Sequence, residues 1–285
     1  MYCLRGKDRR RMEITVRLPA VAGAFYPESK IELKSMISGY LRESKSLSLS
    51  RIPRGRRLRA IIVPHAGYIY SGVIAAAGFN LIKKGRLGKN PRVLLIGPSH
   101  HVAFEGLVTC SYKEWFTPLG KIEVDPLTFK MPHQYSNDVV LLNVAHAQEH
   151  CLEVELPFLQ IFLPSFSLIP LITGEGDPKR FSEILSGFEK DIDLFVVSSD
   201  LSHYYPYEVA KMLDVKANEA IPALDIKKVN EEVEACGKQG ILTIMHLAKK
   251  NNWQGIFVDY KNSGDTAGDK NSVVGYGCYA FYEQS

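Results

Sequence analysis

Three apolar runs typical of buried strands each end shortly before a histidine. His65 follows the run 60–63, His100 follows 93–96, and His203 follows 194–197. In open α/β sheets the carboxyl ends of the strands line the ligand crevice, so these side chains can converge although they lie far apart in the chain. Imidazole binds metals and exchanges protons near neutral pH. The pattern therefore indicates a metal site or an acid–base site.

The neighbours of His65 and His100 favour function over a purely structural role. Pro64 and Gly67 flank His65, and Gly97 lies just before His100. Small or rigid residues let a ligand approach the backbone closely. The adjacent His101 points the opposite way in an extended chain, so only one of this pair is expected to contact the ligand directly.

Asp200 lies three residues before His203. If the strand turns directly into a helical turn, the two side chains face one another. A carboxylate raises the pKa of a nearby imidazole and selects its tautomer, which suits acid–base catalysis. The alternative is that Asp200 caps a helix and His203 lies on the surface.

The segment Glu149-His150 opens a predicted helix. His146 and His150 are four residues apart, as in zinc proteases, but the HExxH order is absent. Two interpretations remain open here. The segment is structural, or Glu149 and Glu155 orient the metal-binding histidines from behind.

Cys236 lies inside or at a break in a long predicted helix. By itself the thiol is best explained as a buried, inert side chain. Glu232, four residues earlier, would share its helical face and place a carboxylate in the same pocket.

Composition excludes several classes of protein. The 285 residues are 46% hydrophobic and 23% charged, which is typical of a globular protein, and no apolar run reaches the roughly 18 residues of a membrane span. The net charge of +4 is modest. Its two basic clusters, at 5–11 and 51–59, lack interleaved aromatic residues, so no nucleic-acid partner is expected. Five scattered cysteines without a CxxC pair argue against a disulfide framework.

Residues 1–20 are predicted to be a basic extension, with Met12 as an alternative start. The extension lacks the apolar stretch of a signal peptide, so a cytoplasmic location is expected. Residues 21–285 are predicted to form a single α/β domain with a central, mostly parallel sheet flanked by helices. Strands are predicted at 59–64, 92–97, 106–111, 166–172, 193–198, 255–260 and 273–282. Helices are predicted at 29–43, 71–84, 152–162, 178–190, 207–220 and 228–250.

Several motifs together resemble one family. They are Ala22-Gly23-Ala24-Phe25-Tyr26, Pro64-His65-Ala66-Gly67-Tyr68, Gly97-Pro98-Ser99-His100-His101, Glu149-His150, Leu156-Pro157, Ser198-Ser199-Asp200, His203 and Ala235-Cys236-Gly237. From about Val21 onward the chain resembles the Memo family, whose fold is similar to the catalytic subunit of class III extradiol ring-cleaving dioxygenases.

The resemblance implies a metal held by His65, His100 and Cys236, with Asp200 and His203 as catalytic residues beside it. Iron (Fe2+) is the first expectation, with copper or zinc as alternatives. The extradiol enzymes bind iron with two histidines and a glutamate. A cysteine in place of that glutamate gives a softer ligand set, so ring cleavage does not follow from the fold.

Two functions are expected from this resemblance. One is metal-dependent redox or dioxygenase-like chemistry. The other is non-catalytic binding of a small molecule or a phosphopeptide in the same pocket, with contacts from Phe25, Tyr26, Tyr68, Tyr70 and Ser99. Microbial members of the family also imply a functional link to a radical SAM protein.

Overall fold

The computed structural model describes residues 15–44, 53, 55–82 and 87–284. The alternative start at Met12, the first basic cluster and most of the predicted extension 1–20 lie outside the described residues. Of the second basic cluster, Arg57 pairs with Asp193 at 2.9 Å, and Arg59 is buried against Glu189. No helix within the described ranges is both long enough and apolar enough to cross a bilayer.

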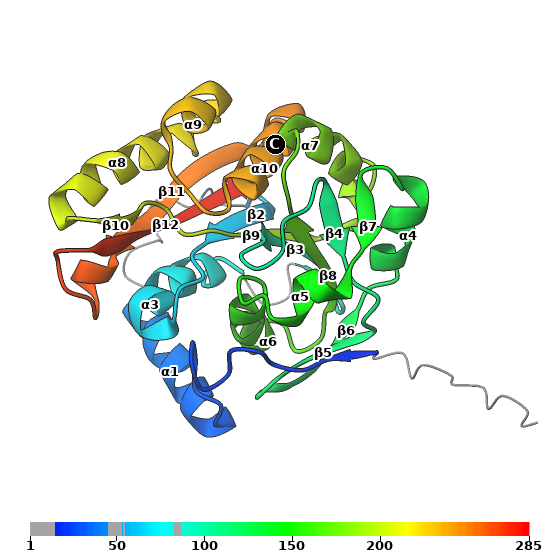
Figure 1. The fold of residues 1–285 in the computed structure, drawn as a ribbon, viewed down its shortest axis with the longest axis horizontal. Coiled ribbons are helices and arrows are strands. Elements are labelled where there is room, and N and C mark those ends of the chain that lie inside the picture. The colour runs from blue at the N-terminus through cyan, green and yellow to red at the C-terminus, as the bar shows by residue number, and fades with distance from the viewer. Residues whose placement is uncertain (1–14, 45–52, 54, 83–86, 285) are drawn as a thin grey trace, which may run out of the picture.

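One sheet of twelve strands organises the described chain (Figure 1). The strands are β1 (Val16–Arg17), β2 (Leu58–Val63), β3 (Arg92–Pro98), β4 (Leu107–Thr109), β5 (Glu114–Thr117), β6 (Gly120–Val124), β7 (Val139–Leu141), β8 (Ser167–Thr173), β9 (Leu194–Ser198), β10 (His203–Tyr205), β11 (Gln254–Asn262) and β12 (Val273–Tyr282). Their main order is β1-β5-β6-β8-β3-β9-β2-β12-β10. The centre, β8-β3-β9-β2, is parallel. Antiparallel strands extend it on both sides, as β12 does next to β2. The predicted single α/β domain is thus confirmed, with a sheet that is parallel at its centre and mixed as a whole.

Helices cover both faces of the sheet (Figure 1). They are α1 (Lys30–Glu43), α3 (Tyr68–Phe79), α4 (Leu127–Gln134), α5 (Asn143–Ala147), α6 (Leu156–Phe162), α7 (Pro178–Ser186), α8 (Tyr207–Ala220), α9 (Ile226–Glu232) and α10 (Lys238–Lys250), with short 3-10 turns η1 (Glu153–Glu155), η2 (Glu189–Asp191) and η3 (Ser263–Asp265). Within β2, Ile61 and Val63 face one apolar cluster, whereas Ala60 and Ile62 face the other. Successive side chains of β2 point to opposite faces of the sheet, and both faces are buried. For this reason the strand appears in the sequence as a continuous hydrophobic run.

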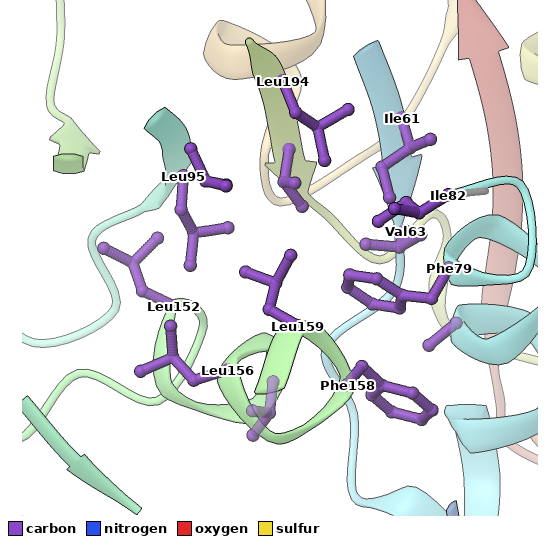
Figure 2. Close-up of a cluster of buried hydrophobic side chains, with 14 of the residues drawn as sticks. Ile61, Val63, Phe79, Ile82, Leu95, Leu152, Leu156, Phe158, Leu159 and Leu194 are labelled. Carbon is purple, nitrogen blue, oxygen red and sulfur yellow. The ribbon is translucent and has the colours of Figure 1, made fainter. Parts of the chain in front are cut away.

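The apolar cluster that contains Ile61 and Val63 also positions the segment that carries Glu149 and His150. Figure 2 shows Leu159 of α6 pointing at side chains of the strands, among them Ile61 and Leu95. Each buried leucine of this kind contributes about 1.5–3 kcal/mol. The packing anchors η1 and α6 beneath the sheet, and so holds the chain just before them near the carboxyl ends of the central strands.

The predicted helix 228–250 is wrong as a single element. The structure has α9, a break, and then α10, and Cys236 lies in the break. Gly237 precedes α10 and packs against the end of β9, where an added Cβ would lie 2.7 Å from the Ser198 carbonyl oxygen. A helix running straight through could not make this approach. Apolar spacing continues across the break, which is why periodicity alone missed it.

Other boundaries moved by a few residues. The helix predicted at 71–84 is α3, which begins earlier and ends at Phe79. The predicted 152–162 begins as the 3-10 turn η1, and 178–190 divides into α7 and η2. The hairpin β5–β6 was not predicted, because its exposed charged positions interrupt the apolar pattern.

Candidate metal centre

The strand order brings the predicted site residues to one edge. Strand β9 lies between β3 and β2, so the loops after these three strands are neighbours. They carry His65 after β2, His100 after β3 and Asp200 after β9. The backbone N–H of His65 donates to Asp200 Oδ1 at 2.8 Å. This bond joins two of the loops directly.

His65, His100 and His150 form what we call the histidine cluster. Their ring centroids lie 5.2 Å (His65 to His100), 5.4 Å (His65 to His150) and 4.5 Å (His100 to His150) apart. One donor atom from each lies within 4.8 Å of the others. Ligands on opposite sides of one ion are separated by about 4 Å, since metal–imidazole bonds are about 2.0–2.1 Å long. The cluster therefore matches the span of a single metal ion.

His150 was not among the ligands expected from the sequence. It comes from the loop after α5 rather than from a strand end, so the strand-end pattern could not identify it. Its only local signal was the adjacent acidic residue Glu149. The structure shows that the spacing to His146 is not meaningful, because His146 is buried against Trp115, with ring centroids 5.8 Å apart.

Glu149 orients His100 from behind. Its Oε1 lies 2.8 Å from His100 Nδ1, and its Oε2 accepts the His100 backbone N–H at 2.7 Å. Burial raises the pKa of the Glu149 carboxyl, but hydrogen bonds from the ring and backbone of His100 outweigh burial and hold the pKa below its usual value. An ionised Glu149 accepts a hydrogen bond from the Nδ1–H group of His100. The other ring nitrogen of His100, Nε2, is therefore free of a proton and faces the cluster.

Burial keeps two of the rings neutral. It lowers the pKa of His65 to about 3, with a further contribution from the charge of His100. It also lowers the pKa of His150 to about 3. Neutral imidazole is the form that binds a metal ion. At neutral pH these two rings are therefore already in the form that binds a metal, and binding releases no proton from them.

Cys236 lies against His65. Its Sγ is 3.2 Å from His65 Nε2 and 3.2 Å from the backbone nitrogen of Asp200. Burial raises the pKa of the Cys236 thiol to about 12, so the metal-free thiol keeps its proton at neutral pH. Glu232, expected on the same helical face, instead ends α9 and pairs with Lys216 at 3.4 Å, with its side chain 46% exposed. The expectation that Glu232 shares the pocket is wrong because the helix ends before Cys236.

The histidine cluster opens into a hollow of about 720 Å³. Its lining residues include Phe25, Tyr70, Asp200, His203, Tyr204 and Tyr276. Burial raises the pKa of Asp200 to about 6, against the opposing effects of the His65 N–H bond and the charge of His203. A carboxyl with this pKa can take up or release a proton near neutral pH.

His203 reaches the hollow from a strand rather than from the helical turn expected after Asp200. It begins β10, which pairs with β12 through an irregular register. The next residue, Tyr204, has a φ of 63° and is 76% exposed. The loop and the irregular strand place Asp200 and His203 on one hollow, while the Asp200 carboxylate bonds to backbone.

The residues expected to contact a ligand divide into three groups. Phe25 and Tyr70 line the hollow. Tyr26 and Tyr68 are core residues, 3% and 2% exposed, whose hydroxyls donate to Glu153 Oε1 and to the Val154 carbonyl oxygen, each at 2.6 Å. Ser99 borders a second hollow of about 530 Å³, which it shares with Cys236.

The fold and the histidine cluster together define an α/β protein with a candidate metal centre at the carboxyl ends of its central strands. The sequence model of the family described as "Memo-like protein" matches residues 17–280, and the chain belongs to this family. The resemblance predicted from the motifs is thus confirmed.

Proteins similar to this chain are described as MEMO1 family proteins. The chain is 35% identical to a MEMO1 family protein of Sulfurisphaera tokodaii, over 92% of this chain and 97% of that protein. It is 33% identical to one of Nitrosopumilus maritimus, over 93% and 99%. The crystal structure of an uncharacterized Escherichia coli K12 protein aligns with 78% of this chain and 99% of that one, at a TM-score of 0.47 and 11% identity.

Proposed function

We propose that this protein is a metal-dependent enzyme acting on a small molecule. His65, His100 and His150 would hold one metal ion, and Cys236, whose Sγ lies 3.2 Å from His65 Nε2, would be a further ligand. The observation that carries the proposal is the convergence of imidazole nitrogens within 4.8 Å at the wall of a hollow large enough for a small substrate.

The donor set suits iron, with copper or zinc as alternatives. Imidazole binds all three metals, and a thiolate adds a soft donor. Bound iron would supply the redox chemistry with O₂ that protein side chains lack. This ligand set differs from that of an extradiol dioxygenase because a thiol takes the place of a carboxylate. We therefore propose that the reaction is oxidation of a small molecule, of which ring cleavage is one example.

The protein side chains would handle binding and protons. Phe25 and Tyr70 offer aromatic surface to an apolar part of the substrate. Asp200 and His203 border the same hollow and would transfer protons to or from it. The pairing of β10 with β12 would hold the His203 ring at the substrate side of the hollow.

The test is metal analysis of protein purified without a tag or chelator, combined with oxygen-consumption measurements. We expect about one iron per chain, as a mononuclear site requires. Oxygen uptake should depend on that iron. Protein that neither retains nor takes up iron, copper or zinc would refute the proposal.

A second candidate is a non-catalytic binding module for a small molecule or phosphopeptide. The exposed Tyr204, which borders the hollow, favours it because exposed aromatic side chains are common in recognition surfaces. Ligand binding that persists unchanged after metal removal would support this function over catalysis. The cytoplasmic location and the link to a radical SAM protein stay predictions.

A further inference from the structure

A buried pair, Ser198 and Glu155, lies behind His65. Ser198 ends β9, and Glu155 ends the turn η1. Glu155 is 1% exposed, and its Oε2 has no hydrogen-bond partner among the described residues. An ionised carboxylate with one oxygen unpaired in this environment would be costly, since buried charges need partners.

The Ser198 hydroxyl has three close neighbours. Its Oγ lies 2.6 Å from the Cys151 carbonyl oxygen, 2.8 Å from His65 Nδ1 and 3.1 Å from Glu155 Oε1. A hydroxyl donates one hydrogen and accepts two. The carbonyl can only accept, so the serine hydrogen belongs to Cys151 O. The other two neighbours must then donate to Ser198 Oγ.

We propose that Glu155 is a neutral carboxylic acid whose O–H donates to Ser198, and that Ser198 in turn accepts the Nδ1 proton of His65 and so presents His65 Nε2 to the metal. Ser198 is a positioning residue of the candidate centre, and Glu155 keeps the serine hydrogen on Cys151 O. If Glu155 were ionised, it would compete for that hydrogen and leave one buried acceptor unpaired.

The surroundings of Glu155 agree with this assignment. Burial raises the pKa of the Glu155 carboxyl well above its usual value, against the hydrogen bond to Ser198, and the nearby charge of Asp200 raises it further. Glu149, six residues earlier, is the opposite case, because ring and backbone donors surround it and keep it ionised. The two glutamates thus orient two different histidines in different charge states.

Infrared spectroscopy of the metal-free protein tests the protonation. At neutral pH the wild-type spectrum should contain the carbonyl band of a protonated carboxylic acid, which shifts in D₂O and is missing from Glu155→Gln. Asp200→Asn is the control for a nearby carboxyl that also has a raised pKa, and it should leave the Glu155 band in place. A wild-type minus Glu155→Gln difference spectrum that shows only a carboxylate would overturn the assignment.

Metal affinity and nitrogen NMR test the positioning role, which rests on the proposed function. We expect Ser198→Ala to weaken Zn²⁺ binding about 10- to 100-fold, the usual effect of losing a partner behind a metal-binding histidine. Glu155→Gln keeps a donor toward Ser198 and should bind Zn²⁺ like wild type. In metal-free protein the ¹⁵N signals of His65 should report the Nδ1–H tautomer, and Ser198→Ala should change them.

Leu185→Ala is the matched control, because it removes a buried side chain from α7, in the other apolar cluster, without touching these hydrogen bonds. It should lower thermal stability and leave Zn²⁺ affinity unchanged. Unchanged affinity and unchanged His65 signals in Ser198→Ala would overturn the positioning role. If wild type itself binds no metal, the proposed function fails, while the infrared and NMR measurements still decide the states of Glu155 and His65.

Discussion

Two regions of this protein bury charged and imidazole side chains, and they do so in different ways. One is the histidine cluster. The other, which we call the Arg17 cluster, consists of Arg17, Trp115, His146, Glu153 and Tyr26. Arg17 Nη1 pairs with Glu153 Oε2 at 2.8 Å, and its guanidinium lies 4.2 Å from the centre of the Trp115 ring. The remaining Arg17 donors bond to the carbonyl oxygens of His146 and Glu149.

The difference between the regions lies in what their polar groups face. Burial lowers the pKa of His146 to about 3, as it does for His65. In the Arg17 cluster, Arg17 and Glu153 pair with each other out of contact with solvent, and both side chains are at most 2% exposed. In the histidine cluster, nitrogen atoms face a hollow. A perturbed pKa is therefore not enough to identify a functional site. What distinguishes the two regions is whether imidazole nitrogens face a hollow that a ligand can enter.

The strongest way to test this contrast is the double variant His65→Ala with His100→Ala. We expect metal binding to be lost while the fold is retained, because both residues lie in loops at the sheet edge. Metal content and circular dichroism measure the two effects. Unfolding of the double variant would mean that these histidines, like His146, serve structure.

Glu153→Gln should have the converse effect. Removing one partner of a buried ion pair costs about 3–5 kcal/mol, because the other charge is left unpaired. Denaturant unfolding should show this loss, whereas the folded fraction should bind metal normally. The control is Glu114→Gln at the exposed pair with Lys121, where about 0–1 kcal/mol is expected. Equal losses of unfolding free energy in the two variants would show that burial does not strengthen the effect of breaking the Arg17–Glu153 pair.

The pH dependence of stability tests the burial of His146. Its folded pKa of about 3 lies below the ordinary value of 6.5, so its neutral form is favoured by folding. Stability from this group is fully present above pH 6.5 and is lost as pH falls toward 3. Between pH 6.5 and pH 5 the loss should be about 2 kcal/mol, at about 1.4 kcal/mol per pH unit.

His146→Phe keeps a ring against Trp115 but cannot bind a proton. Its unfolding free energy should therefore fall less steeply on acidification than that of wild type. Denaturant titrations at several pH values measure the difference. Parallel curves for the two proteins would show that His146 does not contribute to acid sensitivity.

Cys236→Ser should have the smallest effect. Tenfold weaker metal binding, or about 1.4 kcal/mol, is expected because an alcohol is a poorer soft donor than a thiolate. Since the metal-free thiol has a pKa of about 12, it should react slowly with alkylating reagents at neutral pH. Wild type should release about one more proton than Cys236→Ser on binding metal, which calorimetry in buffers of different ionisation enthalpy measures.

Cys278→Ser is the control, since Cys278 is buried in β12 away from the histidine cluster. It should change neither metal affinity nor proton release. If Cys236→Ser behaves in the same way, Cys236 is not a ligand, and the metal is held by the histidine cluster alone.

Much of the framework could be predicted from the sequence. Apolar runs identified the central strands, because a strand buried on both faces must be apolar at nearly every position. Family motifs identified the fold and pointed to His65, His100 and Asp200 at strand ends. Such signals are local, and each depends on a residue and its near neighbours.

The side-chain partners could not be predicted in the same way. Tyr26 and Tyr68 share motifs with Phe25 and His65, yet both point into the core. His150 joins the cluster only because α6 packs beneath the sheet, and Cys236 reaches His65 only because the helix breaks beside β9.

The sequence by itself determined the fold, the family and the strand-end histidines, because burial periodicity and short motifs are written in consecutive residues. Tertiary structure alone decided which donors face the hollow and which carboxyl groups stand behind them. Glu149, Glu153 and Glu155 lie within seven residues of one another, yet one contacts His100, one Arg17 and one Ser198. The physical reason is that their roles are set by contacts with the loop after β3, with β1 and with β9. The order of those strands in the sheet is not encoded in any local pattern.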